Sequence, residues 1–146
     1  MMTIQFPKNS LQIRHQQGVN EVFDIIRKKW IALTPEEWVR QNWIQFLCTE
    51  KKYPSSLIAV EKEIHLGELK KRSDLVIYNR QSLPWMIIEC KEMEVALSQK
   101  TIDQILRYHI PLPAKYLVIT NGTYSIGYKK EKGQFFEIDL FPDFED

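Results

Sequence analysis

Two charged residues end a strand-like segment near the middle of the chain. The run Met86–Ile88 is apolar on both faces, which is typical of a central strand, and Glu89 and Lys91 follow it. Because side chains alternate along a strand, Glu89 and Lys91 project to one side while Cys90 points to the other and can pack. A carboxylate and an ammonium group are therefore expected to share one small space where the strand leaves the core.

A second acidic residue, Asp74, opens the preceding apolar run, and a polar turn at 79–82 joins the two runs. A meander of this kind brings Asp74 beside Glu89. Two carboxylates from separate strands suit Mg²⁺ or Mn²⁺, which take their remaining ligands from water and phosphate. Lys91 would hold the attacking water or a phosphate oxygen. The pattern predicts metal-dependent phosphodiester hydrolysis without a covalent nucleophile.

Less specific interpretations of these residues remain open at this point. Glu89 and Lys91 by themselves also fit an ion pair at a strand end, and together with Asp74 they could form a buried structural ion network. Glu37 also fits the acidic partner in a capping box begun by Thr34.

The elements that must position these residues follow from hydrophobic spacing and turn residues. Thr34 followed by Pro35 predicts a helix start, and Thr101 with Gln104 offers a capping pair inside a second helix. The strand at 57–64 is expected to alternate, with Glu61 and Glu63 on one face. The predicted elements are a hairpin-like addition within 11–33, a helix over 35–51, a meander of strands at 57–64, 74–78 and 85–90, a helix over 96–109, a buried strand at 115–120, and a hairpin of strands 124–128 and 135–140.

This order predicts a mixed α+β (α/β) fold: helix, three-strand meander, helix and strand around a central mixed sheet. The 146 residues, 44% of them hydrophobic, fit a single domain: an N-terminal addition (1–33), a core (34–122) and a C-terminal hairpin (123–146). No apolar run approaches membrane-spanning length, and no secretory signal pattern opens the chain, so the cytoplasm is the expected location.

Net charge and the metal-binding residue types narrow the expected chemistry. The net charge of +1 does not by itself indicate a nucleic-acid-binding protein. Cys48 and Cys90 form no Cys-x-x-Cys motif, and His15, His65 and His109 show no ligand spacing, so zinc is not expected. Any nucleic-acid site must therefore rest on local arrangement.

Over residues 34–122 the sequence resembles the PD-(D/E)xK nucleases, and within them the N-terminal nuclease domain of type I restriction enzyme motor (R) subunits. The segments that carry the resemblance are Thr34–Gln41, Val60–Glu61, Lys71–Val76, Ile88–Lys91, Gln104 with Tyr108, and Ile119–Gly122. Ser73 stands where the motif's name has proline. The resemblance implies a restriction-endonuclease-like core.

The resemblance also implies roles for particular residues. Asp74 and Glu89 would be metal ligands, Lys91 the catalytic lysine and Gln104 a supporting catalytic residue. Glu37 would match the acidic residue of the first helix and be a further metal ligand, and the capping box remains its alternative role. A separate set, Lys71, Arg72 and Tyr108, is expected to contact nucleic acid.

The expected function is a Mg²⁺-dependent DNA endonuclease in restriction, defence or DNA processing. Its expected partners are DNA and either a second copy of the chain or other restriction subunits. The sequence contains no Gly-x-x-x-x-Gly-Lys-Ser/Thr phosphate loop, so neither an ATP-driven motor nor a nucleotide cofactor is expected. The alternative is a catalytically silent module of the same fold that binds nucleic acid or a protein. The choice between DNA and RNA, and between single and double strands, stays open.

Overall fold

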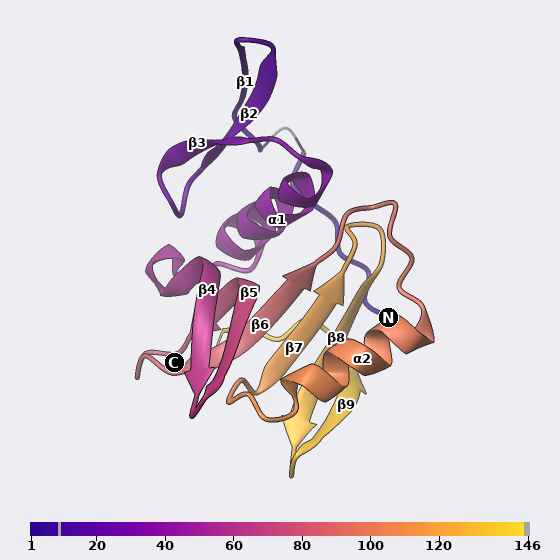
Figure 1. The fold of residues 1–146 in the computed structure, drawn as a ribbon. Helices are drawn as coiled ribbons and strands as arrows, with labels where there is room; N and C mark the ends of the chain where they lie inside the picture. Colours follow the sequence, from indigo (N-terminus) through magenta and orange to yellow (C-terminus); the bar gives the residue numbers. More distant parts are fainter. Residues whose placement is uncertain (9, 145–146) are drawn as a thin grey trace.

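A computed structural model describes residues 1–8 and 10–144, and its largest feature is a mixed β-sheet (Figure 1). Within the described residues this sheet has six strands in the order β4-β5-β6-β7-β8-β9. The strands are β4 (Ile58–Leu66), β5 (Leu69–Tyr78), β6 (Pro84–Cys90), β7 (Tyr116–Thr120), β8 (Ser125–Glu131) and β9 (Gln134–Ile138). Neighbouring strands are antiparallel except β6 and β7, which are parallel. This parallel pair is joined by a crossover that contains helix α2 (Gln99–His109).

Helix α1 (Pro35–Gln45) and helix α2 pack against two different clusters of sheet residues. On the central strand β6, Ile88 belongs to the cluster that contains Trp43 of α1. The preceding residue, Ile87, belongs to the cluster that contains Ile102 of α2. Because successive strand residues face opposite sides, the two helices cover opposite faces of the sheet. By the same alternation, Glu89 faces α2.

The element order predicted from the sequence, from the first helix to the final hairpin, is confirmed. Strand β7 is buried at each of its residues, as expected for a strand covered on both faces. Cys90 is buried in the α1-side cluster, so it packs as predicted. Strand β5 begins earlier than expected, at Leu69, because it continues pairing with β4 up to the turn at Gly67.

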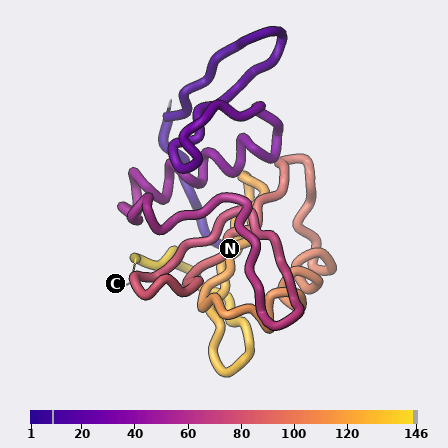
Figure 2. Tube along the Cα trace, turned by 60° about the vertical axis from the view of Figure 1, so that its left-hand side comes forward, coloured from indigo at the N-terminus to yellow at the C-terminus, as the bar shows by residue number. Residues whose placement is uncertain are grey.

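The N-terminal segment contains three strands, where the sequence predicted a hairpin. These strands are β1 (Ile13–Gln16), β2 (Val19–Asp24) and β3 (Lys29–Ala32), which form a separate antiparallel sheet. Figures 1 and 2 both show this sheet on the far side of α1 from the six-stranded sheet. The extra strand arises at Asp24, whose carboxylate accepts hydrogen bonds from the N–H groups of Ile26 and Arg27 and so stabilises a second turn.

The helix boundaries differ from the predicted ones for local reasons. Thr34 caps α1 as predicted, by accepting a hydrogen bond from the Glu37 N–H. The α-helix ends at Gln45 and continues as a π-helical turn, η1 (Phe46–Glu50), before a short 3₁₀ turn, η2 (Ser55–Leu57). Helix α2 starts at Gln99 because Ser98 caps it by accepting from the Thr101 N–H, so the predicted Thr101–Gln104 capping pair is wrong. No helix in the described part of the chain is both long and apolar enough to cross a membrane.

Strand β4 changes the direction of its side chains at Glu61. Ile58 and Val60 pack on the α1 side, but Ile64 packs on the α2 side, so the regular alternation predicted for 57–64 is wrong. The cause is the backbone of Glu61, which has a φ of +52°, in the left-handed region that non-glycine residues rarely adopt. Such a conformation costs about 1–3 kcal/mol and persists only where the surroundings enforce it. Glu61 lies on β4, which pairs with β5, the strand that contains Asp74.

Candidate functional site

Asp74 and Glu89 lie across from each other on the central strands β5 and β6. The strands pair Leu75 with Ile88, and one further step along this antiparallel register brings Asp74 opposite Glu89. The Asp74 Oδ2 accepts a hydrogen bond of 2.8 Å from the Cys90 backbone N–H, which fixes the carboxylate against β6. The structure thus brings together the two carboxylates that the sequence placed in neighbouring strands.

The two carboxylates strongly affect each other. Burial, followed by the charge of Glu89, raises the pKa of Asp74 to about 6, although the Cys90 N–H and the Arg40 guanidinium act in the opposite direction. Burial would also raise the pKa of Glu89, but His109 and then Lys71 outweigh it and lower that pKa. The site therefore holds a pair of carboxylates in which Asp74 resists ionisation because it is buried and because Glu89 is charged.

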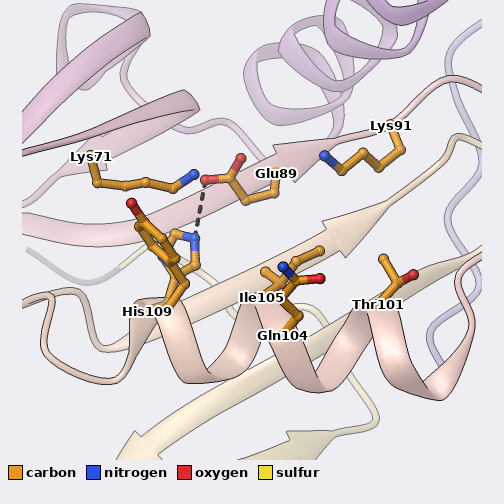
Figure 3. Close-up of a pocket in the computed structure, with 8 residues that line it drawn as sticks. Lys71, Glu89, Lys91, Thr101, Gln104, Ile105 and His109 are labelled. Atoms are coloured by element: carbon orange, nitrogen blue, oxygen red, sulfur yellow. Dashed lines mark ion pairs between the residues drawn. The ribbon is translucent and has the colours of Figure 1, made fainter.

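His109 lies at the end of α2 and faces Glu89 (Figure 3). Its Nε2 is 3.2 Å from the Glu89 Oε1, within ion-pair distance, and both side chains are buried. The contact lacks hydrogen-bond geometry, and neither atom has a hydrogen-bond partner within the described residues. The buried Glu89 Oε1 is therefore held by an ion-pair contact with His109 and by no hydrogen bond.

A pocket of about 240 Å³ opens between β5, β6 and α2, beside Glu89 (Figure 3). Its lining residues are Lys71, Glu89, Lys91, Thr101, Gln104, Ile105, Tyr108 and His109. Lys91 directly follows β6, and in Figure 3 its ammonium group points toward Glu89. Gln104 and Tyr108 lie one helical turn apart, so both reach the pocket from α2. The pocket thus collects the predicted lysine, glutamine and tyrosine around one of the two carboxylates.

The residues predicted to contact nucleic acid divide between the pocket and the opposite side of β5. The Lys71 Nζ lies 4.9 Å from the centroid of the Tyr108 ring, and both residues line the pocket. Arg72, the next residue of β5, points elsewhere and donates a hydrogen bond of 2.6 Å to Glu61. Tyr108 is half exposed, so its ring remains accessible at the rim. The geometry groups Lys71 and Tyr108 and leaves Arg72 outside the pocket.

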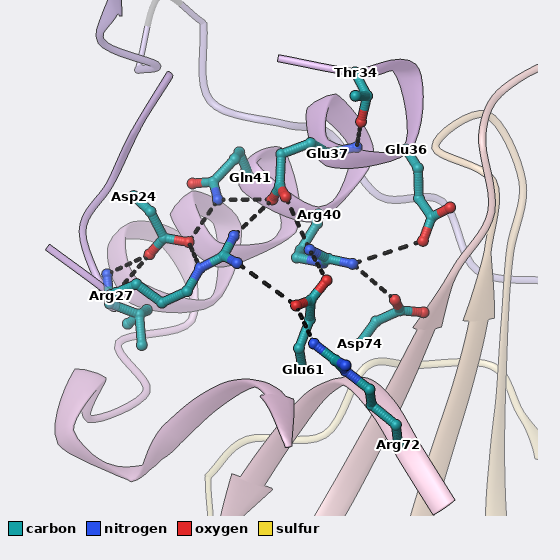
Figure 4. Close-up of polar contacts among 11 residues, drawn as sticks. Asp24, Arg27, Thr34, Glu36, Glu37, Arg40, Gln41, Glu61, Arg72 and Asp74 are labelled. Atoms are coloured by element: carbon teal, nitrogen blue, oxygen red, sulfur yellow. Dashed lines mark hydrogen bonds and ion pairs between the residues drawn. The ribbon is translucent and has the colours of Figure 1, made fainter. Parts of the chain in front are cut away.

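Glu37 does not line the pocket. It takes part in a cluster of ion pairs around α1 (Figure 4). Its carboxylate lies 2.9 Å from Arg40 Nη1 and 3.1 Å from Arg27 Nη2, and it also accepts from Gln41. The Glu37 backbone N–H serves the helix cap, but the carboxylate is directed to the two arginines. The Thr34 N–H donates to the Ala32 carbonyl, so the Glu37 carboxylate does not close the predicted capping box and lies in an ion-pair network instead.

No role at the site was predicted for Arg40 or His109, and Glu61 was expected only on a strand face that it shares with Glu63. Arg40 Nη2 lies 2.9 Å from Asp74 Oδ1, and Arg40 Nη1 lies 3.2 Å from Glu61 Oε1. The only usable signal for Arg40 was its place in the helix segment Thr34–Gln41. His109 directly follows Tyr108 on α2 and lines the same pocket, but its sequence spacing to other possible ligands gives no metal-binding pattern.

The carboxylates fit a hard divalent cation. The described residues contain no group of three or more His, Cys, Asp or Glu arranged to hold a metal. Mg²⁺, however, is commonly bound through one or two carboxylates, with water and phosphate completing its coordination. Glu89 offers a buried oxygen without a hydrogen-bond partner, and burial together with the charge of Glu89 raises the pKa of Asp74, so a cation between the two carboxylates would favour their ionised forms. Asp74 and Glu89 are therefore the residues that would hold Mg²⁺ or Mn²⁺.

Comparison with known protein families gives one match across most of the chain. A family model described as the N terminus of the type I restriction enzyme R protein matches residues 35–142. This match confirms the resemblance seen in the sequence and extends it through the C-terminal hairpin. The mixed sheet with a helix on each face is compatible with the restriction-endonuclease-like fold expected from it. No curated protein matches the sequence significantly.

Proposed function

Because the chain belongs to the family of type I restriction enzyme R protein N-terminal domains, we propose that it is a Mg²⁺-dependent endonuclease that hydrolyses DNA phosphodiester bonds. The family makes it a restriction-related, nuclease-like domain. The observation that carries the proposal further is the meeting of Asp74, Glu89 and Lys91 at one end of β6, beside a pocket that also contains Gln104.

Each residue contributes a distinct step to the proposed hydrolysis. Asp74 and Glu89 would hold a divalent ion, which would neutralise charge on the phosphate and make its bound water more acidic. Lys91 Nζ holds the attacking water or a non-bridging phosphate oxygen by donating hydrogen bonds. Gln104, which reaches the pocket from α2, can orient the same phosphate group through its amide. These groups are mounted on strands and a helix, so the reacting geometry is held before substrate arrives.

DNA is the proposed partner of the pocket rim. Lys71 supplies a positive charge for a backbone phosphate, and the half-exposed Tyr108 ring offers a surface for a sugar or base. The described residues provide one set of Asp74, Glu89 and Lys91, which suffices for one strand. Cutting both strands of a duplex therefore calls for a second copy of the chain or for sequential cuts, and other restriction subunits are the proposed source of sequence specificity.

The proposal is tested by incubating the purified protein with supercoiled plasmid and Mg²⁺ or Mn²⁺. The expected result is conversion to nicked or linear DNA that EDTA prevents. A single-stranded DNA and an RNA of the same sequence, run in parallel, define the substrate class. Failure to cut any of these with either metal, while DNA binding is retained, would contradict the enzymatic proposal.

One observation favours a second candidate function, a silent module that binds nucleic acid or a protein partner. Arg40 already pairs with Asp74 Oδ1, so one carboxylate of the centre is neutralised by the protein itself. A silent module would bind DNA in a salt-sensitive manner without turnover. It would also show no divalent-ion binding by titration calorimetry, which separates it from the nuclease.

The raised pKa of Asp74 predicts how metal binding depends on pH. The pKa in the fold, about 6, lies above the ordinary value of 3.8, so ionisation of Asp74 destabilises the metal-free fold as pH rises through this range. A cation that requires the ionised carboxylate should bind about tenfold more weakly for each pH unit below about 6.

We therefore expect Mg²⁺ to raise the melting temperature more at about pH 7.5 than at about pH 5. Differential scanning fluorimetry with and without EDTA measures the effect. Asp74→Asn serves as the control, because it removes the titrating group and should abolish the pH-dependent part of the shift. Equal shifts at both pH values in the parent protein would refute the assignment.

A further inference from the structure

Arg40 lies inside a cluster of four carboxylates that come from three elements (Figure 4). Its Nη2 is 2.9 Å from Asp74 Oδ1 on β5 and 3.6 Å from Glu36 Oε1 on α1. Its Nη1 is 2.9 Å from Glu37 Oε1 on α1 and 3.2 Å from Glu61 Oε1 on β4. One guanidinium group thus contacts the metal-ligand candidate Asp74 and three further acids at the same time.

The guanidinium is held in this position more tightly than a surface arginine would be. Its side chain is 5% exposed, and a buried charge of this kind is tolerated only where it is fully paired. Burial opposes the charge, but Glu37, Asp74 and Glu61 outweigh this effect and raise the pKa of Arg40 further. Arg40 is therefore a permanent positive charge beside the carboxylate pair.

The backbone of Glu61 shows that this arrangement is specifically built. Glu61 adopts a left-handed conformation in the middle of β4, and its carboxylate contacts Arg40, Arg72 and, at 3.9 Å, Arg27. The cationic partners also lower the pKa of Glu61 despite its partial burial. The left-handed backbone of Glu61 is less stable than a regular strand conformation, and it places Glu61 Oε1 beside the guanidinium of Arg40.

Asp74 is shared between two positive charges in the proposed nuclease. Its Oδ1 faces Arg40, its Oδ2 accepts from the Cys90 N–H, and its across-strand neighbour is Glu89. A divalent ion between Asp74 and Glu89 would meet Arg40 on the other side of the Asp74 carboxylate. One oxygen of each of the four acids faces Arg40, while Glu37 Oε2 pairs with Arg27 and Glu61 Oε2 pairs with Arg72. The guanidinium therefore occupies the place beside Asp74 Oδ1 that a second divalent ion would need.

Building on the proposed function, we propose that Arg40 is the positioning residue of the nuclease centre, a fixed cation that takes the place of a second metal ion. It fixes the orientation of Asp74 and neutralises Glu37 and Glu61, so that the centre binds a single divalent ion between Asp74 and Glu89. The arginine supplies the second positive charge that two-metal nucleases take from solution.

The test counts Mn²⁺ ions bound to the protein, by electron paramagnetic resonance of free Mn²⁺ and by titration calorimetry. The parent protein should bind one ion. Arg40→Met, which removes the charge but keeps a long side chain, should bind two, because the four oxygens that face Arg40 then lose their shared cation. Arg40→Gln, which is polar but uncharged, should also bind two and keeps the inference testable if Arg40→Met fails to fold. Arg40→Lys should bind one, since it restores a positive charge.

Arg27→Met is the matched control. Arg27 pairs with Asp24, Glu37 and Glu61 in the same network but does not contact Asp74. This variant should lose stability and still bind one ion, which separates general loosening of the network from the effect of Arg40.

The possible outcomes distinguish this inference from the proposed function. Two ions in the parent, or one ion in a folded Arg40→Met variant, would overturn the role of Arg40 and leave the nuclease proposal standing. No Mn²⁺ bound to the parent at millimolar concentration would overturn both. One ion in the parent, two in Arg40→Met and one in both Arg40→Lys and Arg27→Met would establish the inference.

Discussion

Replacing Glu89 by glutamine should remove divalent-ion binding and reduce DNA cleavage by about 10³-fold or more. The change keeps the shape of the side chain but removes the charge of the one carboxylate that lies at the pocket and has an oxygen without a hydrogen-bond partner. A catalytic metal stabilises the transition state by several kcal/mol, and each loss of about 1.4 kcal/mol is tenfold in rate. Plasmid cleavage and Mn²⁺ titration measure the two effects.

The folded state of Glu89→Gln should survive the change. Glutamine keeps the volume, and the loss of the Glu89 charge relieves the repulsion that raises the pKa of Asp74. Glu63→Gln is the matched control, since Glu63 is an exposed acid of β4 outside the pocket. Glu63→Gln should cut and bind metal like the parent. Parental cleavage by Glu89→Gln would exclude the proposed centre.

Replacing Lys91 by methionine should reduce cleavage by about 10²–10³-fold while leaving divalent-ion binding in place. This is the scale of losing one well-placed donor to a developing anion. The main chain at Lys91 is fixed independently of its side chain, because its N–H donates a 2.7 Å hydrogen bond to the Thr120 carbonyl on β7. The variant should therefore keep the geometry of β6 and lose only the ammonium group.

A lysine on the same side of the molecule provides the control for Lys91→Met. Lys100 is exposed at the start of α2 and does not line the pocket, so Lys100→Met should cut at the parental rate. The contrast between the two active-site variants is the sharper result: Glu89→Gln should lose metal and cleavage together, whereas Lys91→Met should lose cleavage alone. If Lys91→Met also lost Mn²⁺, the lysine would be part of the metal site, and its proposed role would be wrong.

The elements that depend on local patterns could be predicted from the sequence. Thr34 and Pro35 mark the start of α1, and the uninterrupted apolar stretch 116–119 indicates a strand covered on both faces. The meander then brings Asp74 to Glu89, because two antiparallel strands joined by a short turn have little freedom in their register. The spacing of apolar residues is therefore enough to predict that Asp74 and Glu89 lie close together.

The remaining site residues depend on how separate elements pack, which no local pattern describes. Arg40 meets Asp74 from 34 positions away because α1 packs against the sheet. His109 meets Glu89 only because α2 folds back over β6. The change of side-chain direction at Glu61 is the hardest feature to predict from the sequence. A left-handed backbone is unfavourable for glutamate, and here it is maintained by charged neighbours such as Arg40.

The region that defines the family is smaller than the region that holds the molecule together. The family match begins at residue 35, yet Met2 lies in the α1-side core and its N–H donates to the Ser125 carbonyl on β8. Arg27, also outside the match, completes the pairing of Glu37. The segment before residue 35 is therefore part of the packed core and of the Glu37 ion pairs, although the family model does not include it.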